Sequence, residues 1–421
     1  MRGAGGLECL GTPWRWTHAG SGRRRQACRP ARERQATVAE LARQREPAVT
    51  ARQSGLRERG VGGDVAAPAS RRSIVRLRSA ALPLLAAGLL VSVVLATAAG
   101  AVAISPLHTA LVLLNATHLF HFPRAWAASD EVILLQLRLP RVAGAVVVGA
   151  ALGMAGTLFQ GLLRNPLADP LLLGTSSGAA LGATIGFILP AEVTITWLGF
   201  GLVAALAFAG SLLAVALVYW LATHRGQTPV VTLLLAGVAV SAMLTAAQTL
   251  LITLNDRLGL RITALYLWIV GGINVQSWTQ VAFVCALVLV GAVGAVALAP
   301  VLDAFALGEE MAAHIGLRVE RAKLAIVALA ALFVAAAVSI SGLVGFVGLI
   351  APHLCRITLG PRHRLLIPAS ALTGAIFVVL ADLGARTITA PTELPLGVLT
   401  ALVGGPFFLV LLRRAGRQYR W

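Results

Sequence analysis

Charge is scarce in this sequence, and lysine scarcer still. Only 12% of its 421 residues are charged, whereas about a quarter are charged in soluble domains, and Lys323 is the single lysine. A phosphate-binding loop needs a glycine-rich turn followed by a lysine, and no such turn precedes Lys323. The sequence therefore lacks this means of binding ATP.

Patterns typical of enzymes and metal sites are also missing. There is no His-Glu-x-x-His motif, and Ser176 and Ser177 lack the setting of a nucleophile elbow, in which Gly-x-Ser-x-Gly follows a strand. The four cysteines are scattered, and His353 and Cys355 have no third or fourth ligand nearby in the sequence. We expect no catalytic residue, no metal site, no bound cofactor and no disulfide framework.

What is present is a series of long apolar runs, with 57% hydrophobic residues. Runs of about 18 or more apolar residues are long enough to cross a membrane as helices, and period-two alternation typical of a barrel is absent. The sequence predicts an all-α integral membrane protein with ten transmembrane helices. We expect them at 80–104, 139–163, 171–190, 194–222, 230–254, 279–302, 322–340, 343–358, 365–386 and 394–412. A shorter apolar stretch, 262–275, is expected at the surface.

The N-terminal part differs in composition from the rest. Residues 1–79 contain 17 arginines and 6 acidic residues, few aromatics and no hydrophobic periodicity. We expect a basic, disordered extension or the product of a misassigned start, although such a tail can also attract nucleic acid or anionic lipid. The expected domains are thus 1–79, a membrane domain at 80–414, and a short basic tail at 415–421.

Loop charges indicate the orientation. With the N-terminus inside and ten alternating helices, twelve basic residues after the extension fall on the cytoplasmic side and six on the outer side. The cytoplasmic set is Arg164, Arg225, Arg318, Arg321, Lys323, Arg356, Arg362, Arg364, Arg413, Arg414, Arg417 and Arg420. The outer set is Arg124, Arg138, Arg141, Arg257, Arg261 and Arg386. This bias follows the positive-inside rule and predicts cytoplasmic termini.

Three of the outer arginines are candidates for binding a partner. Arg138 and Arg141 lie at the start of one predicted span, and Arg386 lies at the outer end of another. Two arginines on an outward rim can steer an acidic partner, although arginines at helix ends also serve as interfacial anchors. Asp382 precedes Arg386 by four residues, a spacing that favours pairing within a helix. Because Asp382 is the only clear acid within a span, a proton-coupled secondary transporter is disfavoured.

The loop at 164–170 is expected to end one helix and start the next. Asn165–Pro166 and Asp169–Pro170 are typical of such boundaries, and small residues follow from Gly174 onward. The segment 159–174 also resembles 346–360, since both contain Phe-x-Gly-Leu, a proline soon afterwards and a final Leu-Gly. Internal repeats of this kind occur in many transporters, with the pathway at their interface.

A cytoplasmic loop at 303–321 is expected to form two short helices broken at Gly308 and Gly316. Leu307, Met311 and Ile315 are four residues apart and form one apolar edge beside Glu309 and Glu310. Such an edge suits docking into the groove of a partner, whereas a solvated connector is the simpler interpretation.

Several of these motifs, in this order, resemble the permease subunit of type II ABC importers, the group for iron siderophores, haem and vitamin B12. The matching segments are RLPR (138–141), QGLLRNPLADPLLLGTSSGAALG (160–182), ALGEEMAAHIG (306–316), GFVGLIAPHLCR (345–356), ADLGAR (381–386) and ELPLGVLTALVGGPFFLVLLRR (393–414).

The resemblance implies the type II permease fold, with ten helices and both termini in the cytoplasm of a bacterial cell. It implies a second permease subunit, identical or similar, an ATPase subunit that binds ATP and Mg, and an extracytoplasmic substrate-binding lipoprotein. It implies that Arg138, Arg141 and Arg386 receive carboxylates of that lipoprotein, and that Gln160, Asn165, Pro166, Asp169, Pro170 and Gly174 shape a structural loop. The ATPase-coupling residues implied are Ala306, Leu307, Gly308, Glu309, Glu310, Met311, Ile315 and Gly316.

The GGPFF ending resembles siderophore importers most, so we expect a ferric siderophore as cargo, ahead of haem and cobalamin. The chain itself is then a transport subunit in the cytoplasmic membrane and not an enzyme. The alternatives are a proton-coupled exporter, a membrane anchor whose tail binds nucleic acid, and a membrane enzyme.

Overall fold

A computed structural model describes residues 69–100, 104–116, 122–124, 126–189, 200–255, 258–259 and 261–416. These residues belong to one compact unit, 69–421. Most of the predicted extension 1–79 and most of the predicted tail 415–421 lie outside the described residues, as does Arg257.

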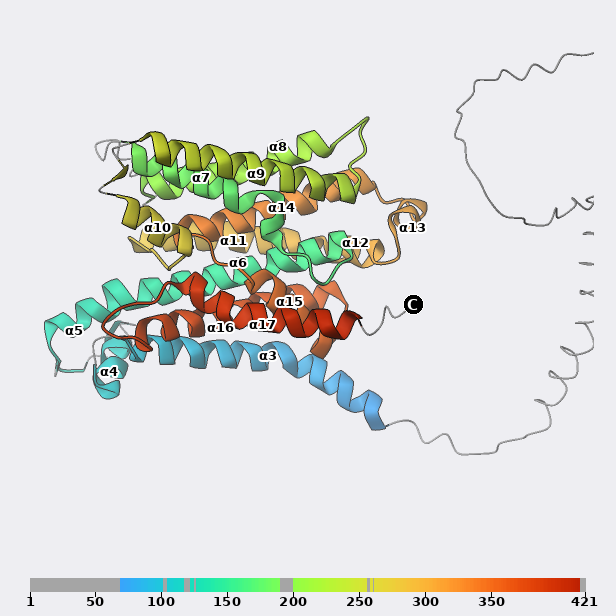
Figure 1. Cartoon of the computed structure of the whole chain (residues 1–421). Helices are drawn as coiled ribbons and strands as arrows, with labels where there is room; N and C mark the ends of the chain where they lie inside the picture. The colour runs from blue at the N-terminus through green and yellow to red at the C-terminus, as the bar shows by residue number, and fades with distance from the viewer. Residues whose placement is uncertain are drawn as a thin grey trace, which may run out of the picture. The chain divides into compact units, whose positions relative to one another are not determined.

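The described ranges are almost entirely helical, as predicted (Figure 1). The first half contains α3 (Ala69–Ala98), α4 (Pro106–Ala116), α5 (Ala128–Val132), the π-helix η1 (Ile133–Arg138), α6 (Leu139–Leu163), the 3₁₀-helix η2 (Pro170–Leu173), α7 (Thr175–Ile188), α8 (Leu202–Ala222) and α9 (Val230–Leu254). The second half contains α10 (Ile262–Val270), α11 (Trp278–Ala297), α12 (Ala299–Phe305), α13 (Glu309–His314), α14 (Val319–Ser341), α15 (Val347–Leu359), α16 (His363–Thr387) and α17 (Leu396–Gly416).

Eight of the ten predicted spans are confirmed as helices long and apolar enough to cross a membrane within the described part of the chain. The other two, at 171–190 and 343–358, contain α7 and α15, which have only 14 and 13 residues. At 1.5 Å per residue these helices extend roughly 20 Å, less than the ~30 Å hydrocarbon core of a bilayer. The expectation of ten full-length spans is therefore not confirmed for these two.

Both short helices start late because the apolar segment before them is not α-helical. Before α7 the chain forms η2 and then turns at Gly174, whose φ of 83° is left-handed. Before α15 it turns at Gly342 and at Phe346, whose φ values are 60° and 68°. Hydropathy counts such apolar turns as helix, which explains why the predicted spans were too long.

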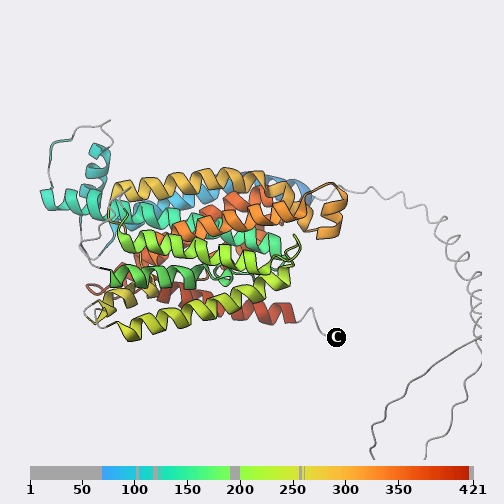
Figure 2. The same ribbon diagram turned by 90° about the horizontal axis from the view of Figure 1, so that it is seen from above.

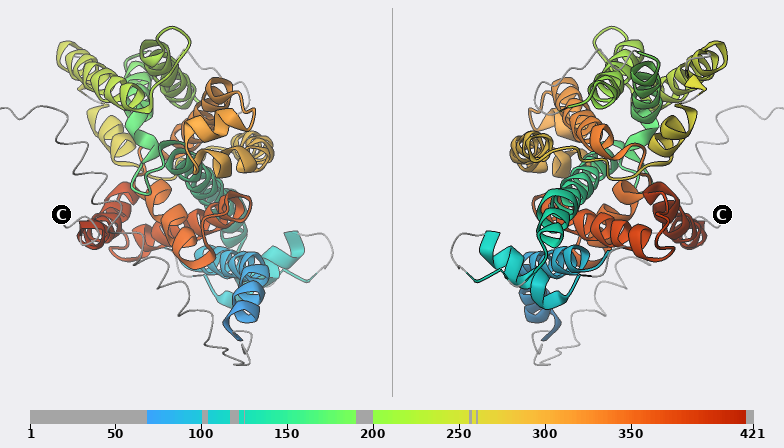
Figure 3. Two further views of the ribbon diagram at one scale, coloured as in Figure 1. Left: turned by 90° about the vertical axis from the view of Figure 1, so that its right-hand side faces the viewer. Right: turned by 90° about the vertical axis from the view of Figure 1, so that its left-hand side faces the viewer.

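Helix α6 lies at the centre of the bundle, between α7–α9 on one side and α3 with α15–α17 on the other (Figure 3). Small residues make this position possible. A Cβ built on Gly149 would overlap the carbonyl group of Gly374, and one built on Gly153 would overlap that of Ser370. The backbones of α6 and α16 therefore touch, a close approach that small residues permit.

The two ends of the bundle differ. The start of α3, the end of α17 and helices α12 and α13 lie at one end, named the α13 end (Figures 1 and 2). The start of α5, helix α10 and the connection 388–395 lie at the opposite end, named the α10 end. The short apolar stretch predicted at the surface forms α10, in which Leu265 and Trp268 are nevertheless buried.

Candidate functional site

Asp382 is the centre of a charged cluster at the α10 end. Its side chain is 1% exposed, and its two oxygens accept hydrogen bonds from Arg141 Nε at 3.0 Å and Arg386 Nε at 2.9 Å. The predicted pairing of Asp382 with Arg386 along one helix face is confirmed. Helices α6 and α16 are therefore joined by a buried ion pair at the point where their glycine contact ends.

Arg386 and Arg138 also bind the carbonyl groups at the end of α3. Arg386 donates to the Ala96 carbonyl at 3.1 Å, and Arg138 donates to those of Thr97 and Ala98 at 3.3 and 3.2 Å. The last carbonyls of a helix lack partners within it and favour positive charge nearby. Arg138 is 6% exposed and Arg386 is 4% exposed, so the two cations bind the end of α3 and do not form an outward patch.

Arg141 is the member of the three whose side chain reaches the surface. It is 23% exposed and donates to the Glu393 carboxylate at 2.9 Å. A cavity of about 200 Å³ adjoins both residues and is further lined by segments 271–274 and 394–396. Arg141 and Arg386 thus share Asp382, and Arg138 and Arg386 share the end of α3, while only Arg141 is accessible. Their docking role stays a prediction.

The predicted packing residue Gln160 contacts the first turn of α15. Its side chain is 1% exposed, and its amide donates to the carbonyls of Gly348 and Leu349 at 3.4 and 3.3 Å. Pro352, four residues after Gly348, has no N–H, so it leaves the Gly348 carbonyl without its helical donor. Gln160 supplies the missing hydrogen bond from α6.

Asp169 of the predicted loop caps two helices at once. Its Oδ1 accepts from the Leu171 N–H at 2.9 Å at the start of η2, and the carboxylate also accepts from the N–H of Phe346 at the start of α15. Pro170 packs on Gly348, where an added Cβ would lie 2.7 Å from the proline ring. The starts of η2 and α15 therefore meet inside the bundle.

The remaining loop residues adopt the predicted boundary roles. Arg164 ends α6 in a left-handed conformation with a φ of 50°. The Asn165 side chain accepts from the Leu167 N–H at 3.0 Å across Pro166, forming a local turn.

At the α13 end, the predicted loop 303–321 contains the short helix α13, whereas the other short helix, α12, already begins at Ala299, within the predicted span 279–302. Gly308 separates them with a φ of 113°, and Gly316 follows with 87°. Leu307, Met311 and Ile315 are 72%, 51% and 61% exposed, so the predicted apolar edge faces outward. Ala306 and Glu310 are exposed beside it.

The single lysine holds this segment in place. Lys323 is 4% exposed, and its Nζ lies 2.6 Å from Glu309, 3.2 Å from Glu320 and 3.0 Å from the Thr228 carbonyl. Glu320 also accepts from the Thr228 N–H at 3.0 Å. The Lys323 cluster, comprising Lys323, Glu309, Glu320 and Thr228, thus connects α13 to α14 and to the segment that precedes α9.

Sequence reasoning identified Lys323 only as a charge. Its position four residues into α14, three residues after Glu320, is the one local signal for this cluster, because that spacing supports a salt bridge. Sequence reasoning also missed a contact of α12. Asp303 Oδ1 lies 2.6 Å from His363 Nδ1 and accepts a hydrogen bond from the backbone N–H of His363 at 3.1 Å. This contact joins α12 to the start of α16.

The matches to known proteins agree with this arrangement. The FecCD transport family matches residues 88–414. The chain belongs to this family. FecCD members include permease subunits of ABC importers for iron siderophores, haem and vitamin B12, and this chain is a multi-pass protein of the cytoplasmic membrane.

Individual relatives cover most of the membrane domain. The chain is 44% identical over 283 residues to the cobalamin import system permease protein BtuC of Halobacterium salinarum, covering 67% of this chain and 74% of that one. It is 41% identical to the hemin transport system permease protein HmuU of Yersinia pestis, over 68% and 84%. It is 33% identical to the Fe(3+)-citrate import system permease protein YfmE of Bacillus subtilis, over 80% and 96%.

A solved structure has the same fold. It is described as an inward-facing conformation of a metal-chelate type ABC transporter. Its sequence is 27% identical, the TM-score is 0.67, and the match covers 79% of this chain and 98% of that one.

We expect Asp382→Asn to destabilise the fold far more than Glu393→Gln. The first change leaves the buried Arg386 and the half-buried Arg141 without their shared carboxylate, a loss of about 3–5 kcal/mol when a buried pair is broken. Glu393 is 47% exposed, and such surface pairs contribute at most about 1 kcal/mol. Unfolding midpoints of the detergent-solubilised variants measure the difference, and equal midpoints would contradict it.

Proposed function

We propose that this chain is the permease subunit of an ATP-driven importer for a ferric siderophore. The observation that carries the importer mechanism is the exposed apolar edge of α13, which the Lys323 cluster fastens to α14 and to the segment before α9. A partner that moved this edge would move two membrane helices with it.

The α13 end faces the cytoplasm in this proposal. Both ends of the described chain lie at the α13 end, which requires an even number of crossings, and ten crossings result when α7 and α15 each complete one. The basic residues predicted inside also gather at the α13 end, among them Arg164, Arg225, Arg318, Arg362 and Arg364. This distribution supports cytoplasmic termini.

The partner at the α13 end is an ATPase subunit that binds ATP and Mg. Leu307, Met311 and Ile315 supply apolar anchors, and Glu309 behind them contacts Lys323. ATP-driven closure of the ATPase would displace α13, and the buried Lys323 would transmit that displacement. The permease itself hydrolyses nothing.

The partner at the α10 end is an extracytoplasmic substrate-binding lipoprotein. Arg141 and the adjacent cavity of about 200 Å³ offer a partly exposed cation in a recess that fits an acidic side chain. Arg386 positions Arg141 through the shared Asp382, and Arg138 acts through the end of α3, which Arg386 also binds.

A second permease subunit, identical or similar, completes the pathway. Helices α9 and α17 are the least buried of the candidate spans. In the most apolar 18-residue stretch of each helix, only 17% is buried inside the protein. Their outward apolar side chains, including Leu235, Met243, Leu402 and Leu409, are available to a second subunit and to lipid.

The choice of cargo rests on two observations. The GGPFF ending resembles siderophore importers, and the Fe(3+)-citrate relative matches more of this chain than the cobalamin and hemin relatives do. Cobalamin is the second candidate, because the 44% identity to a cobalamin permease favours it.

We expect cells that lack this gene to lose uptake of radiolabelled iron supplied as a ferric siderophore while retaining uptake of haem and cobalamin. A plasmid copy that begins at residue 69 should restore uptake. If uptake of cobalamin or haem were lost while iron uptake stayed normal, the proposed cargo would change but the importer mechanism would stand. Unchanged uptake of all three would contradict the proposal.

We expect Arg141→Gln to weaken binding of the substrate-binding lipoprotein by about tenfold or more, because a partly desolvated cation loses its acidic partner. Arg124→Gln is the matched control, since Arg124 lies at the α10 end but is 76% exposed and outside the Asp382 cluster. Surface plasmon resonance on the purified complex gives the dissociation constants. Equal constants for the two variants would remove the docking role of Arg141.

We expect Lys323→Met and Glu309→Gln each to lower substrate uptake per ATP hydrolysed by about tenfold, since either change breaks a buried ion pair at the coupling segment. The double variant should be no worse than either single one, because both act through one contact. Glu310→Gln, in an exposed neighbour, should behave as wild type. Normal coupling in Lys323→Met, with the ATPase still co-purifying, would refute this role.

A further inference from the structure

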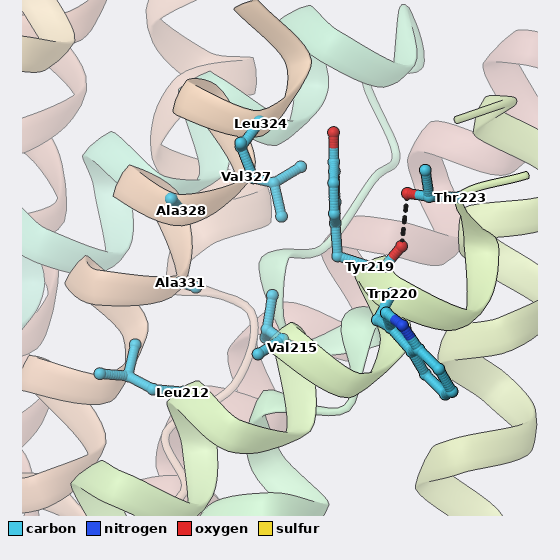
Figure 4. A pocket seen from close by; sticks show the side chains of 10 residues that line it. Leu212, Val215, Tyr219, Trp220, Thr223, Leu324, Val327, Ala328 and Ala331 are labelled. Atoms are coloured by element: carbon cyan, nitrogen blue, oxygen red, sulfur yellow. Dashed lines mark hydrogen bonds between the residues drawn. The ribbon is translucent and has the colours of Figure 1, made fainter. Parts of the chain in front are cut away.

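A groove lies between α8 and α14 near the α13 end, beside the Lys323 cluster. Its volume is about 520 Å³, and apolar side chains line it almost completely (Figure 4). Val215, Val327 and Ala331 form a buried floor, whereas Trp220 and Leu324 at the rim are 72% and 49% exposed. Both helices are candidate membrane spans, so the groove lies within the membrane-spanning part of the described chain.

Toward the α13 end, two aromatic side chains line the groove. In Figure 4 the Tyr219 ring lies along the groove, with its hydroxyl at the level of Leu324 near the start of α14. Trp220 lies on the next position of α8. Tyrosine and tryptophan are enriched where a membrane helix meets the headgroup region. The aromatic pair therefore marks the depth at which an acyl chain gives way to a headgroup.

Each helix places an arginine beyond this aromatic pair. Arg321, Leu324 and Ala328 follow one another at three and four residues, so they share one face of α14, and Arg321 is the member nearest the helix start. Arg225 follows the end of α8 in a tight turn closed by the bridge between His224 and Gln227. Both arginines are exposed.

We propose that this groove binds an anionic phospholipid. One acyl chain lies between α8 and α14 against Val215, Val327 and Ala331, and the phosphate lies between Arg225 and Arg321. Basic residues at the cytoplasmic ends of membrane helices attract anionic headgroups, and apolar grooves retain the chain by its CH₂ groups. A zwitterionic lipid would also fill the apolar groove, but its ammonium group offsets the charge of its phosphate, so it would bind the two guanidinium groups less strongly than an anionic lipid.

The bound lipid would adjoin the Lys323 cluster. Leu324 of the rim follows Lys323 in the chain, and the hydroxyl of Thr223, which also lines the groove, lies 3.0 Å from that of Thr228. An anionic lipid would therefore favour one spacing of α8 and α14 where α13 is fastened. This consequence for coupling rests on the proposed function, whereas the binding itself does not.

Quenching of Trp220 fluorescence tests the binding. The full-length chain is reconstituted into phosphatidylcholine vesicles that contain either brominated phosphatidylglycerol or brominated phosphatidylcholine at the same mole fraction. The signal of Trp220 is the difference between the wild type and Trp220→Phe. We expect brominated phosphatidylglycerol to reach half-maximal quenching of Trp220 at a lower mole fraction than brominated phosphatidylcholine does. Each contributing arginine should lower that mole fraction about fivefold, because an arginine near an anionic surface contributes about 1 kcal/mol.

Two further variants separate the headgroup from the chain. Arg225→Gln with Arg321→Gln should abolish the preference for phosphatidylglycerol, whereas Arg362→Gln with Arg364→Gln, exposed arginines at the start of α16, should preserve it. Ala328→Leu, which fills the groove without adding a tryptophan, should reduce quenching by the anionic lipid. Unfolding midpoints verify that each variant is folded.

Three results would overturn the proposal. Equal quenching of wild-type Trp220 by the two brominated lipids would show that no anionic lipid is selected. Quenching by neither lipid would show that something other than lipid covers the groove, such as a second copy of the chain. Unchanged preference after removal of both arginines would exclude the headgroup site. Because the permease alone is measured, each result leaves the proposed transport function intact.

Discussion

The contact of α6 with α16 is the constraint on which both ends of the molecule depend. In a membrane, helices gain little from excluding lipid, so they associate where small residues let backbones touch. Gly149 and Gly153 provide this contact, and the same approach brings Arg141 of α6 within reach of Asp382 on α16. Further along α6, Gln160 reaches the carbonyl that Pro352 leaves unpaired. A wider spacing of α6 and α16 would separate Arg141 from Asp382, and a wider spacing of α6 and α15 would separate Gln160 from Gly348.

The sequence was informative where one local segment determines the structure. Helix positions, the breaks at Gly308 and Gly316, and the pairing of Asp382 with Arg386 all follow from hydropathy, glycine conformation or helical spacing. It was uninformative where a polar side chain binds a distant backbone. Arg386 donates to a carbonyl 290 residues away, and Lys323 to one 95 residues away. Every residue has a backbone carbonyl, so the sequence does not reveal which carbonyl a side chain binds. For this reason Arg138 and Arg386 were expected on the surface, although they are buried.

The two repeat-like segments are connected through their helix starts. Asp169 accepts hydrogen bonds from Leu171 in η2 and from Phe346, the residue before α15, and Pro170 lies against Gly348. The helices η2 and α15 thus begin in the interior on one shared carboxylate. A movement of the loop after α6 must carry the start of α15 with it, and this places concerted motion at the centre of a bundle whose charged clusters lie at its two ends.

The rarity of lysine has a practical consequence for the chemistry of this molecule. Lys323 carries the only side-chain primary amine in the sequence, and its nitrogen is enclosed by two carboxylates and a carbonyl. Acylating reagents react with an uncharged, accessible amine, so they can modify Lys323 only when this enclosure opens. The rate at which the side chain is acylated therefore reports, without any engineered label, how often the contacts that hold α13, α14 and the segment before α9 together open.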